Sequence, residues 1–223
     1  MIAQREGFGD VLANGILPVV DYISDGDEKI RNEILDFAVH AKGLEISAYI
    51  PRVSIAQQVS YATSLIGAHH REAWLIFIDA IKNEIPEFKQ KAETLVFYQD
   101  VRTWTDIAGF CKLHWIDVRN PASKGPKNLV TLKLYIDAIN AVTGVNWPME
   151  KHLAVATRAY NLAKLINLRR GLGKKDDHLP KRAMGKVTME QFDELLEKYY
   201  EMRGWDFEGK PFNQTLRSLE IEV

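Results

Sequence analysis

The sequence predicts a multihelical, all-α protein. Apolar residues recur at intervals of three or four along most of the 223 residues, as they do on one face of a helix. The alternation of apolar and polar residues that is typical of strands is scarce, and its best example is the short segment 44–49. Glycine and proline interrupt the helical pattern at intervals that divide the chain into about six to eight helices of ordinary length.

The expected helix boundaries follow the helix-breaking residues along the chain. These boundaries are Asp25-Gly26, Pro51, Pro86, the segment 120–126, Gly144 with Pro148, and the segment 171–180. Three apolar stripes are the clearest between them. They consist of Leu132, Tyr135, Ile136, Ile139 and Val142, then Val155, Ala159, Leu162 and Ile166, and finally Phe192, Leu195, Leu196, Tyr199 and Met202. Each stripe predicts a helix with one apolar face.

The charge balance excludes one class of partner. The chain has 29 Lys and Arg residues against 30 Asp and Glu residues, so its formal net charge is −1. Because there is no basic excess to displace counterions from a phosphate backbone, we expect no general binding to nucleic acid. A hydrophobic content of 46% and a charged content of 26% are typical of a globular domain and too apolar for a disordered chain.

Other features predict a cytoplasmic protein without a membrane partner. The longest apolar run, 73–81, contains Asp79 and is too short to span a bilayer. The first turns carry Arg5, Glu6 and Asp10, which do not resemble a secretory signal. A single cysteine excludes an internal disulfide and is typical of a reducing compartment.

The longest polar connection runs from Arg170 to Arg182 and has a local basic excess. It could contact a phosphate group or an acidic partner. It is more simply a solvated connection between helices, because Asp176 and Asp177 lie within it.

Common catalytic signatures do not explain the sequence. His69 and His70 are adjacent, but no further ligand follows at the spacing of a helical zinc site. The chain has no Gly-x-Ser-x-Gly elbow, no dinucleotide-binding glycine motif and no phosphate-binding loop.

The segment Asp106-Ile-Ala-Gly-Phe-Cys111 is the strongest candidate for chemistry. It brings a carboxylate, a glycine and the one thiol of the chain together within six residues. The carboxylate could accept hydrogen bonds from a bound heterocycle, the glycine could let the backbone approach a ligand, and the thiolate could bind iron. Taken alone, Cys111 could equally be a small core residue.

Six passages resemble one family in the same order. Asp106-x-x-Gly109-Phe110-Cys111 is similar to the Asp-x-x-Gly-Leu-Cys motif of the tungsten-containing aldehyde ferredoxin oxidoreductases. The other passages are Arg5-Glu-Gly-Phe-Gly-Asp-Val-Leu-Ala-Asn-Gly15, Lys42-Gly-Leu-Glu-Ile-Ser-Ala-Tyr49, Tyr61-Ala-Thr-Ser64 with Gly67 and His70, Asn167-Leu-Arg-Arg-Gly171 with Lys175-Asp-Asp177 and Leu179-Pro180, and Tyr200-Glu-Met-Arg-Gly-Trp205. The chain is therefore identified as a member of that family.

The resemblance implies an architecture. Family members have a pterin-binding, β-rich first domain followed by two helical domains, and this chain resembles roughly the last third. Residues 1–40 would be the end of the second domain, and residues 41–223 would be the third domain.

The resemblance also implies cofactors and site residues. The family holds tungsten, or sometimes molybdenum, between two pterin dithiolenes beside a 4Fe-4S cluster. Asp106 would hydrogen-bond a pterin, Gly109 and Phe110 would contribute backbone, and Cys111 would be the fourth cluster ligand. His70 and Tyr49 would line the aldehyde pocket. His70 could instead be a histidine with a purely structural hydrogen bond, and Tyr49 could be structural too.

Two passages beside the inferred pocket depart from the family pattern. The family usually has Asp-Pro-Arg-Gly where this chain has Ile50-Pro-Arg-Val53, and Ser-Asn-Arg-Gly where it has Ser64-Leu-Ile-Gly67. Both changes replace polar residues with apolar ones and allow a different substrate or a lost activity.

Two functions remain open at this point. A cluster needs four thiolates, and this chain has one cysteine, so missing N-terminal domains or a partner chain would have to supply the rest. With them, the chain would be part of an enzyme that oxidises a small aldehyde to a carboxylic acid and passes electrons to ferredoxin. Alternatively, it is a non-catalytic helical scaffold or a truncated remnant of the same family that binds no metal alone.

Overall fold

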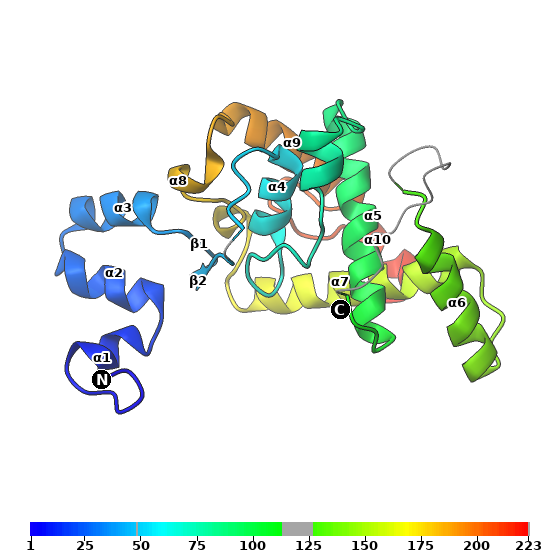
Figure 1. Ribbon diagram of the computed structural model, residues 1–223, viewed down its shortest axis with the longest axis horizontal. Helices are drawn as coiled ribbons and strands as arrows, with labels where there is room; N and C mark the ends of the chain where they lie inside the picture. The colour runs from blue at the N-terminus through cyan, green and yellow to red at the C-terminus, as the bar shows by residue number, and fades with distance from the viewer. Residues whose placement is uncertain (48, 113–126, 223) are drawn as a thin grey trace.

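The computed structural model describes residues 1–47, 49–112 and 127–222, and the all-α prediction is confirmed (Figure 1). The α-helices are α1 (Phe8–Leu12), α2 (Ile16–Ser24), α3 (Glu28–Phe37), α4 (Ile55–Thr63), α5 (Phe88–Ile107), α6 (Val130–Thr143), α7 (Met149–Arg169), α8 (Lys181–Met184), α9 (Met189–Arg203) and α10 (Asn213–Ser218). A π-helix, η1 (Phe77–Ile81), and a 3-10 helix, η2 (Lys174–Asp176), complete the helical elements. Seven of these described helices, α2 to α7 and α9, have nine residues or more, in agreement with the expected number.

A short hairpin takes the place of the expected strand. β1 (His40–Ala41) pairs antiparallel with β2 (Leu44–Glu45), with His40 opposite Glu45 and Ala41 opposite Leu44. The pairing covers the start of the segment 44–49, and residue 48 lies outside the described residues. The hairpin joins α3 to α4 and is therefore the connection between the two parts of the molecule seen in Figure 1.

The helices form a main body with a smaller group beside it. In Figure 1, α1, α2 and α3 lie on one side, and α6 lies on the opposite side. In the body, α5 packs against α7 and α9, and α4 packs against α9. The main hydrophobic cluster begins at Ala41 and ends at Trp205, so it contains none of the residues of α1 to α3.

The predicted boundaries are found where they can be observed. Asp25 and Gly144 end their helices in the left-handed conformation, and Pro148 lies directly before α7. The segment 120–126 lies outside the described residues. None of the helices in the described ranges combines the length and apolar character that a membrane span needs.

The apolar stripes have three different outcomes. In α9, Phe192, Leu195, Leu196 and Tyr199 are buried in the core, as expected. In α6, Leu132 and Ile136 are buried, but Val142 is 86% exposed. In α7, the buried residues are His152, Ala156, Tyr160, Asn161, Lys164 and Asn167, whereas Leu162 and Ile166 of the expected stripe are exposed. Helix α7 thus buries a largely polar face.

Candidate functional site

The structure brings together Tyr49 and His70, two residues that the family resemblance assigns to one pocket. Their ring centroids lie 4.8 Å apart in an edge-to-face arrangement. Trp74 is a third member of this group, 5.4 Å from Tyr49 and 5.1 Å from His70. We call these three rings the aromatic cluster. Nothing in the sequence singled out Trp74, because it lies in irregular structure where spacing along the chain does not predict contacts.

Tyr49 is held by its backbone while its ring reaches the surface. The hydroxyl of Tyr61, a fully buried residue of α4, donates a hydrogen bond of 2.9 Å to the carbonyl oxygen of Tyr49. Tyr49 as a whole is 52% exposed to solvent. Tyr61 belongs to the family-like passage Tyr61-Ala-Thr-Ser64. A side chain of that passage therefore holds the backbone of Tyr49 in place.

Both histidines of the adjacent pair have a lowered pKa. Burial lowers the pKa of His70, and the positive charges of Arg71 and Arg102 lower it further. Burial, followed by Lys112 and Arg71, lowers the pKa of His69. The imidazole of His70 is therefore mostly uncharged at neutral pH and can accept a proton. Its Nδ1 lies 3.5 Å from the hydroxyl oxygen of Ser47, the long limit of a hydrogen bond.

The predicted motif Asp106 to Cys111 forms the end of α5 and the turn that follows. The backbone N–H of Phe110 donates to the carbonyl of Thr105 at 3.0 Å, and Gly109 adopts a positive φ of 76°. A glycine suits this turn because other residues rarely adopt such a conformation. Within the described ranges, no atom lies within 4 Å of the position that a Cβ of Gly109 would occupy.

The side chains of this motif differ in their surroundings. The carboxylate of Asp106 is 60% exposed and forms an ion pair of 2.6 Å with the ammonium group of Lys112. Cys111 is exposed rather than part of the core, so the interpretation of it as a small core residue is wrong. The ring of Phe110 packs against Tyr135 with centroids 4.3 Å apart.

The aromatic cluster and the Asp106–Lys112 pair lie in one region. Glu72, two residues after His70, is buried, and burial raises its pKa while Lys112 acts to lower it. Asp106 and Lys112 also act on the pKa of His69. These charge effects place the segment of His69 and Glu72 within electrostatic range of the end of α5. The two groups of predicted residues thus lie on segments that influence each other electrostatically.

Apolar side chains are exposed at the positions that depart from the family pattern. Ile50 and Ile66 are exposed, and Val53 is 71% exposed. Because these side chains reach solvent, they are not explained as core residues.

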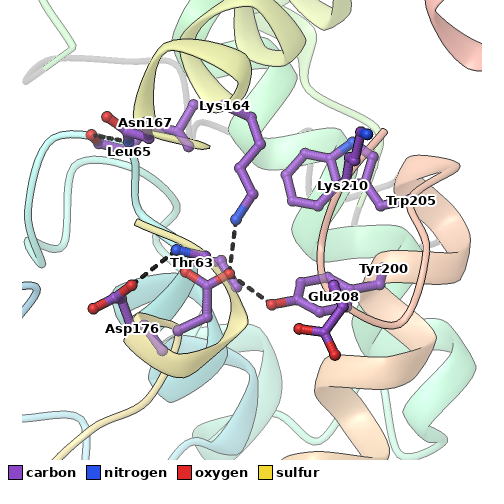
Figure 2. A network of polar contacts seen from close by, with 12 residues as sticks. Thr63, Leu65, Lys164, Asn167, Asp176, Tyr200, Trp205, Glu208 and Lys210 are labelled. Carbon is purple, nitrogen blue, oxygen red and sulfur yellow. Dashed lines mark hydrogen bonds and ion pairs between the residues drawn. The ribbon is translucent and has the colours of Figure 1, made fainter. Parts of the chain in front are cut away.

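A buried polar network lies within the body and joins several of the family-like passages. The carboxylate of Asp177 accepts a hydrogen bond of 2.6 Å from the hydroxyl of Tyr200 and contacts the ammonium group of Lys164 at 2.9 Å. Figure 2 shows Lys164 and Tyr200 pointing toward the same oxygen atom. Lys42 contacts the other oxygen of Asp177 at 2.6 Å.

The connection 170–182 is accordingly more than a solvated link. Asp177, Leu179 and Pro180 are buried, whereas Lys175 and His178 are exposed. The alternative of a solvated connection is correct for the exposed residues and wrong for Asp177.

Within the described ranges, no three His, Cys, Asp or Glu side chains are grouped so that they could hold a metal ion. The residues present nevertheless suit the implied cofactors in part. The exposed carboxylate of Asp106 can accept hydrogen bonds, no atom of the described residues crowds the backbone at Gly109, and the exposed thiol of Cys111 can serve as one ligand.

Comparisons with known proteins place the whole chain in one family. The family model described as aldehyde ferredoxin oxidoreductase, domains 2 and 3, matches residues 1–221. The tungsten-containing aldehyde ferredoxin oxidoreductases of Pyrococcus horikoshii and Pyrococcus furiosus are 28% and 29% identical, and each match covers 99% of this chain and 35% of the relative. The aliphatic sulfonate oxidoreductase, WOR-like subunit, of Pyrococcus furiosus is 25% identical, with 99% of this chain and 33% of that protein covered.

A solved structure shares the fold. It is the active-site complex BamBC of benzoyl coenzyme A reductase with 1,5-dienoyl-CoA, which matches with a TM-score of 0.70 and 21% identity over 99% of this chain and 37% of the other. This chain thus spans about a third of the length of the proteins it matches. With its helical fold and the family model covering residues 1–221, the chain belongs to the aldehyde ferredoxin oxidoreductase family.

Proposed function

We propose that this chain is the C-terminal helical part of a tungstopterin and iron–sulfur oxidoreductase that oxidises aldehydes to carboxylic acids, with ferredoxin as the electron acceptor. The observation that carries the proposal is the proximity of two groups. The aromatic cluster of Tyr49, His70 and Trp74 includes the neighbour of His69, whose pKa is influenced by Asp106 and Lys112 at the end of α5, where Asp106 and Cys111 are exposed. This supports a site in which groups suited to a substrate and groups suited to a redox cofactor would lie close to each other.

The residues of the aromatic cluster have roles that follow from their chemistry. Oxidation of an aldehyde with water gives a carboxylic acid, two electrons and two protons, so the site must accept protons. His70 is suited to this because its imidazole is mostly neutral at pH 7. The phenol of Tyr49 reaches the surface and can donate a hydrogen bond to the aldehyde oxygen, which would orient and polarise the carbonyl group.

The residues at the end of α5 would serve the cofactors. Asp106 would accept a hydrogen bond from an N–H group of a pterin, and the backbone of Gly109 and Phe110 would lie against it. Cys111 would be one thiolate ligand of a 4Fe-4S cluster. When bound, these cofactors would supply the two-electron redox chemistry of the oxidation and the transfer of electrons to the acceptor. Both cofactors require residues outside this chain.

The rest of the assembly is part of the proposal. N-terminal domains or a partner chain would supply the other cysteines and the other pterin contacts. Residues 1–40 would belong to the second domain and residues 41–223 to the third, a division supported by the main hydrophobic cluster, which begins at Ala41. We also propose a small aldehyde as the substrate and the cytoplasm as the location.

A pair of histidine variants tests the function. In the anaerobically purified protein with its co-purifying chains, aldehyde-dependent reduction of ferredoxin is expected for the wild type. We expect His70→Gln to lower kcat by about a hundredfold or more, because Gln cannot accept a proton. His178→Gln changes an exposed histidine outside the site and should leave kcat within about twofold.

Two outcomes oppose the proposal. Equal activity of His70→Gln and wild type would remove His70 from the reaction. Absence of aldehyde oxidation in the wild-type assembly, with any acceptor, would favour the alternative of a non-catalytic helical scaffold.

A further inference from the structure

Segment 64–75 carries His70 and Trp74 but has no regular secondary structure. Its backbone therefore cannot be held by a helical or strand ladder, and its geometry depends on bonds from other elements. Two buried amide side chains, one on α4 and one on α7, provide such bonds at its two ends. Neither residue is among the candidate site residues considered above.

Asn167 holds the near end of the segment. Its side-chain Nδ2 donates a hydrogen bond of 2.9 Å to the carbonyl oxygen of Leu65, and Figure 2 shows this contact. Asn167 lies on the buried polar face of α7. The hydroxyl of Ser64 adds a bond of 2.6 Å to the carbonyl of Gly67, which tightens the first turn of the segment.

Gln57 holds the far end with both halves of its amide. Its Nε2 donates to the carbonyl of Ala73 at 2.7 Å, and its Oε1 accepts from the backbone N–H of Leu75 at 2.8 Å. Gln57 is fully buried on α4. Its two bonds lie on either side of Trp74, so they fix the backbone from which that indole projects.

We propose that Gln57 and Asn167 are positioning residues that clamp segment 64–75 and thereby hold His70 and Trp74 against Tyr49. The clamp gives an irregular segment a defined geometry, as a site for ordered substrate binding requires. Its importance for catalysis rests on the proposed function, but its existence can be tested without any activity.

The chain offers matched controls for both residues. Gln58 follows Gln57 on α4, is equally buried, and donates to the carbonyls of Pro51 and Met184 instead. Asn161 lies on α7, is also fully buried, and bonds to Thr157 and Trp205. Gln58→Ala removes two side-chain hydrogen bonds, as Gln57→Ala does, and Asn161→Ala removes two where Asn167→Ala removes one, but both control variants leave segment 64–75 held.

The test is hydrogen exchange of the backbone amides of residues 64–75 in the full chain, read by mass spectrometry. We expect Gln57→Ala and Asn167→Ala to speed exchange in this segment by about tenfold, because the segment opens locally when one end is released. Gln58→Ala and Asn161→Ala should leave exchange in residues 64–75 within about twofold of wild type, even if they lower Tm as much as the first pair of variants does. Nuclear Overhauser contacts between the rings of His70 and Trp74 should weaken only in the first pair.

The proposal is overturned if all four variants change exchange in residues 64–75 equally, or if the first pair leaves it at the wild-type rate. Should an alanine variant fail to fold, Gln57→Met and Asn167→Leu keep the side-chain volume without the hydrogen bonds and give the same readout. If the first pair speeds exchange in residues 64–75 but aldehyde oxidation is unchanged, the clamp exists but is not important for catalysis. If exchange behaves as predicted but the wild-type assembly oxidises no aldehyde, only the proposed function is refuted.

Discussion

Lys42 and Asp177 form a buried ion pair of 2.6 Å, although one follows β1 and the other lies between α7 and α8. The second oxygen of the same carboxylate contacts Lys164 at 2.9 Å, so two ammonium groups share one carboxylate. All three side chains are at most 5% exposed. The pair therefore ties the hairpin, which leads to Tyr49, to the body of the molecule.

Removing the charge of Asp177 should be strongly destabilising. Asp177→Asn leaves the two lysines buried without a counter-ion, and we expect the free energy of unfolding in urea to fall by about 3–5 kcal/mol. Asp176→Asn is the matched control. Asp176 accepts a hydrogen bond from Gly173, which an asparagine can still do, so a change within about 0.5 kcal/mol is expected. Similar losses in the two variants would contradict the role of the ion pair.

The same carboxylate predicts a loss of stability in acid. Burial acts to raise the pKa of Asp177, but the ammonium groups of Lys42 and Lys164 outweigh it, so the pKa lies below its ordinary value. A carboxyl group with a lowered pKa in the folded state stabilises the protein above its unfolded pKa of about 4. This contribution is lost as the pH falls through the lower, folded pKa. Urea unfolding of wild type and Asp177→Asn below pH 4 should therefore converge, and a constant difference would contradict this account.

His152 predicts a second, milder dependence on pH. Its Nδ1 accepts a hydrogen bond of 3.2 Å from the indole of Trp104, and its Nε2 lies 2.9 Å from the side-chain oxygen of Asn140. Burial lowers the pKa of His152, so the unfolded state binds more protons below about pH 6.5. Stability should thus fall between pH 7 and pH 5. In His152→Gln, which keeps a donor and an acceptor but does not titrate, we expect a shallower slope of unfolding free energy against pH. An unchanged slope would exclude this histidine as a source.

Cys111 should matter for iron and not for folding. Because the residue is exposed, Cys111→Ser should change the free energy of unfolding of the chain by less than about 0.5 kcal/mol. In the assembled protein, the same variant should lower the iron content, since a cluster would lose one of its four ligands. Iron analysis and urea unfolding of the same preparation separate the two effects. A variant with full iron content would show that Cys111 is not a ligand.

The sequence predicted the helices better than it predicted their packing. Apolar periodicity located α7 but favoured the face with Leu162 and Ile166, which are exposed. The face that is buried carries Lys164 and Asn167, whose partners Asp177 and Leu65 lie on other segments. Burial of a polar side chain depends on such distant partners, and a local pattern of apolar residues does not contain them.

The sequence predicted those residues of the candidate site that lie in family-like passages. Tyr49, His70 and the segment from Asp106 to Cys111 were found through their resemblance to a family. Trp74 was not, because its contact with the other rings depends on the path of an irregular segment. Glu72 was missed for a similar reason, since its burial beside Lys112 requires the end of α5 to fold against the His69–His70 segment.

The central claim is that this chain contributes to a tungstopterin and iron–sulfur centre, and metal analysis of the anaerobically purified native protein tests it most directly. The co-purifying chains should be identified by mass in the same preparation. We predict tungsten or molybdenum with about four irons per assembly, together with a polypeptide region that carries the other cysteines. A natively purified protein with neither metal nor such a region would contradict the claim and would favour a helical scaffold.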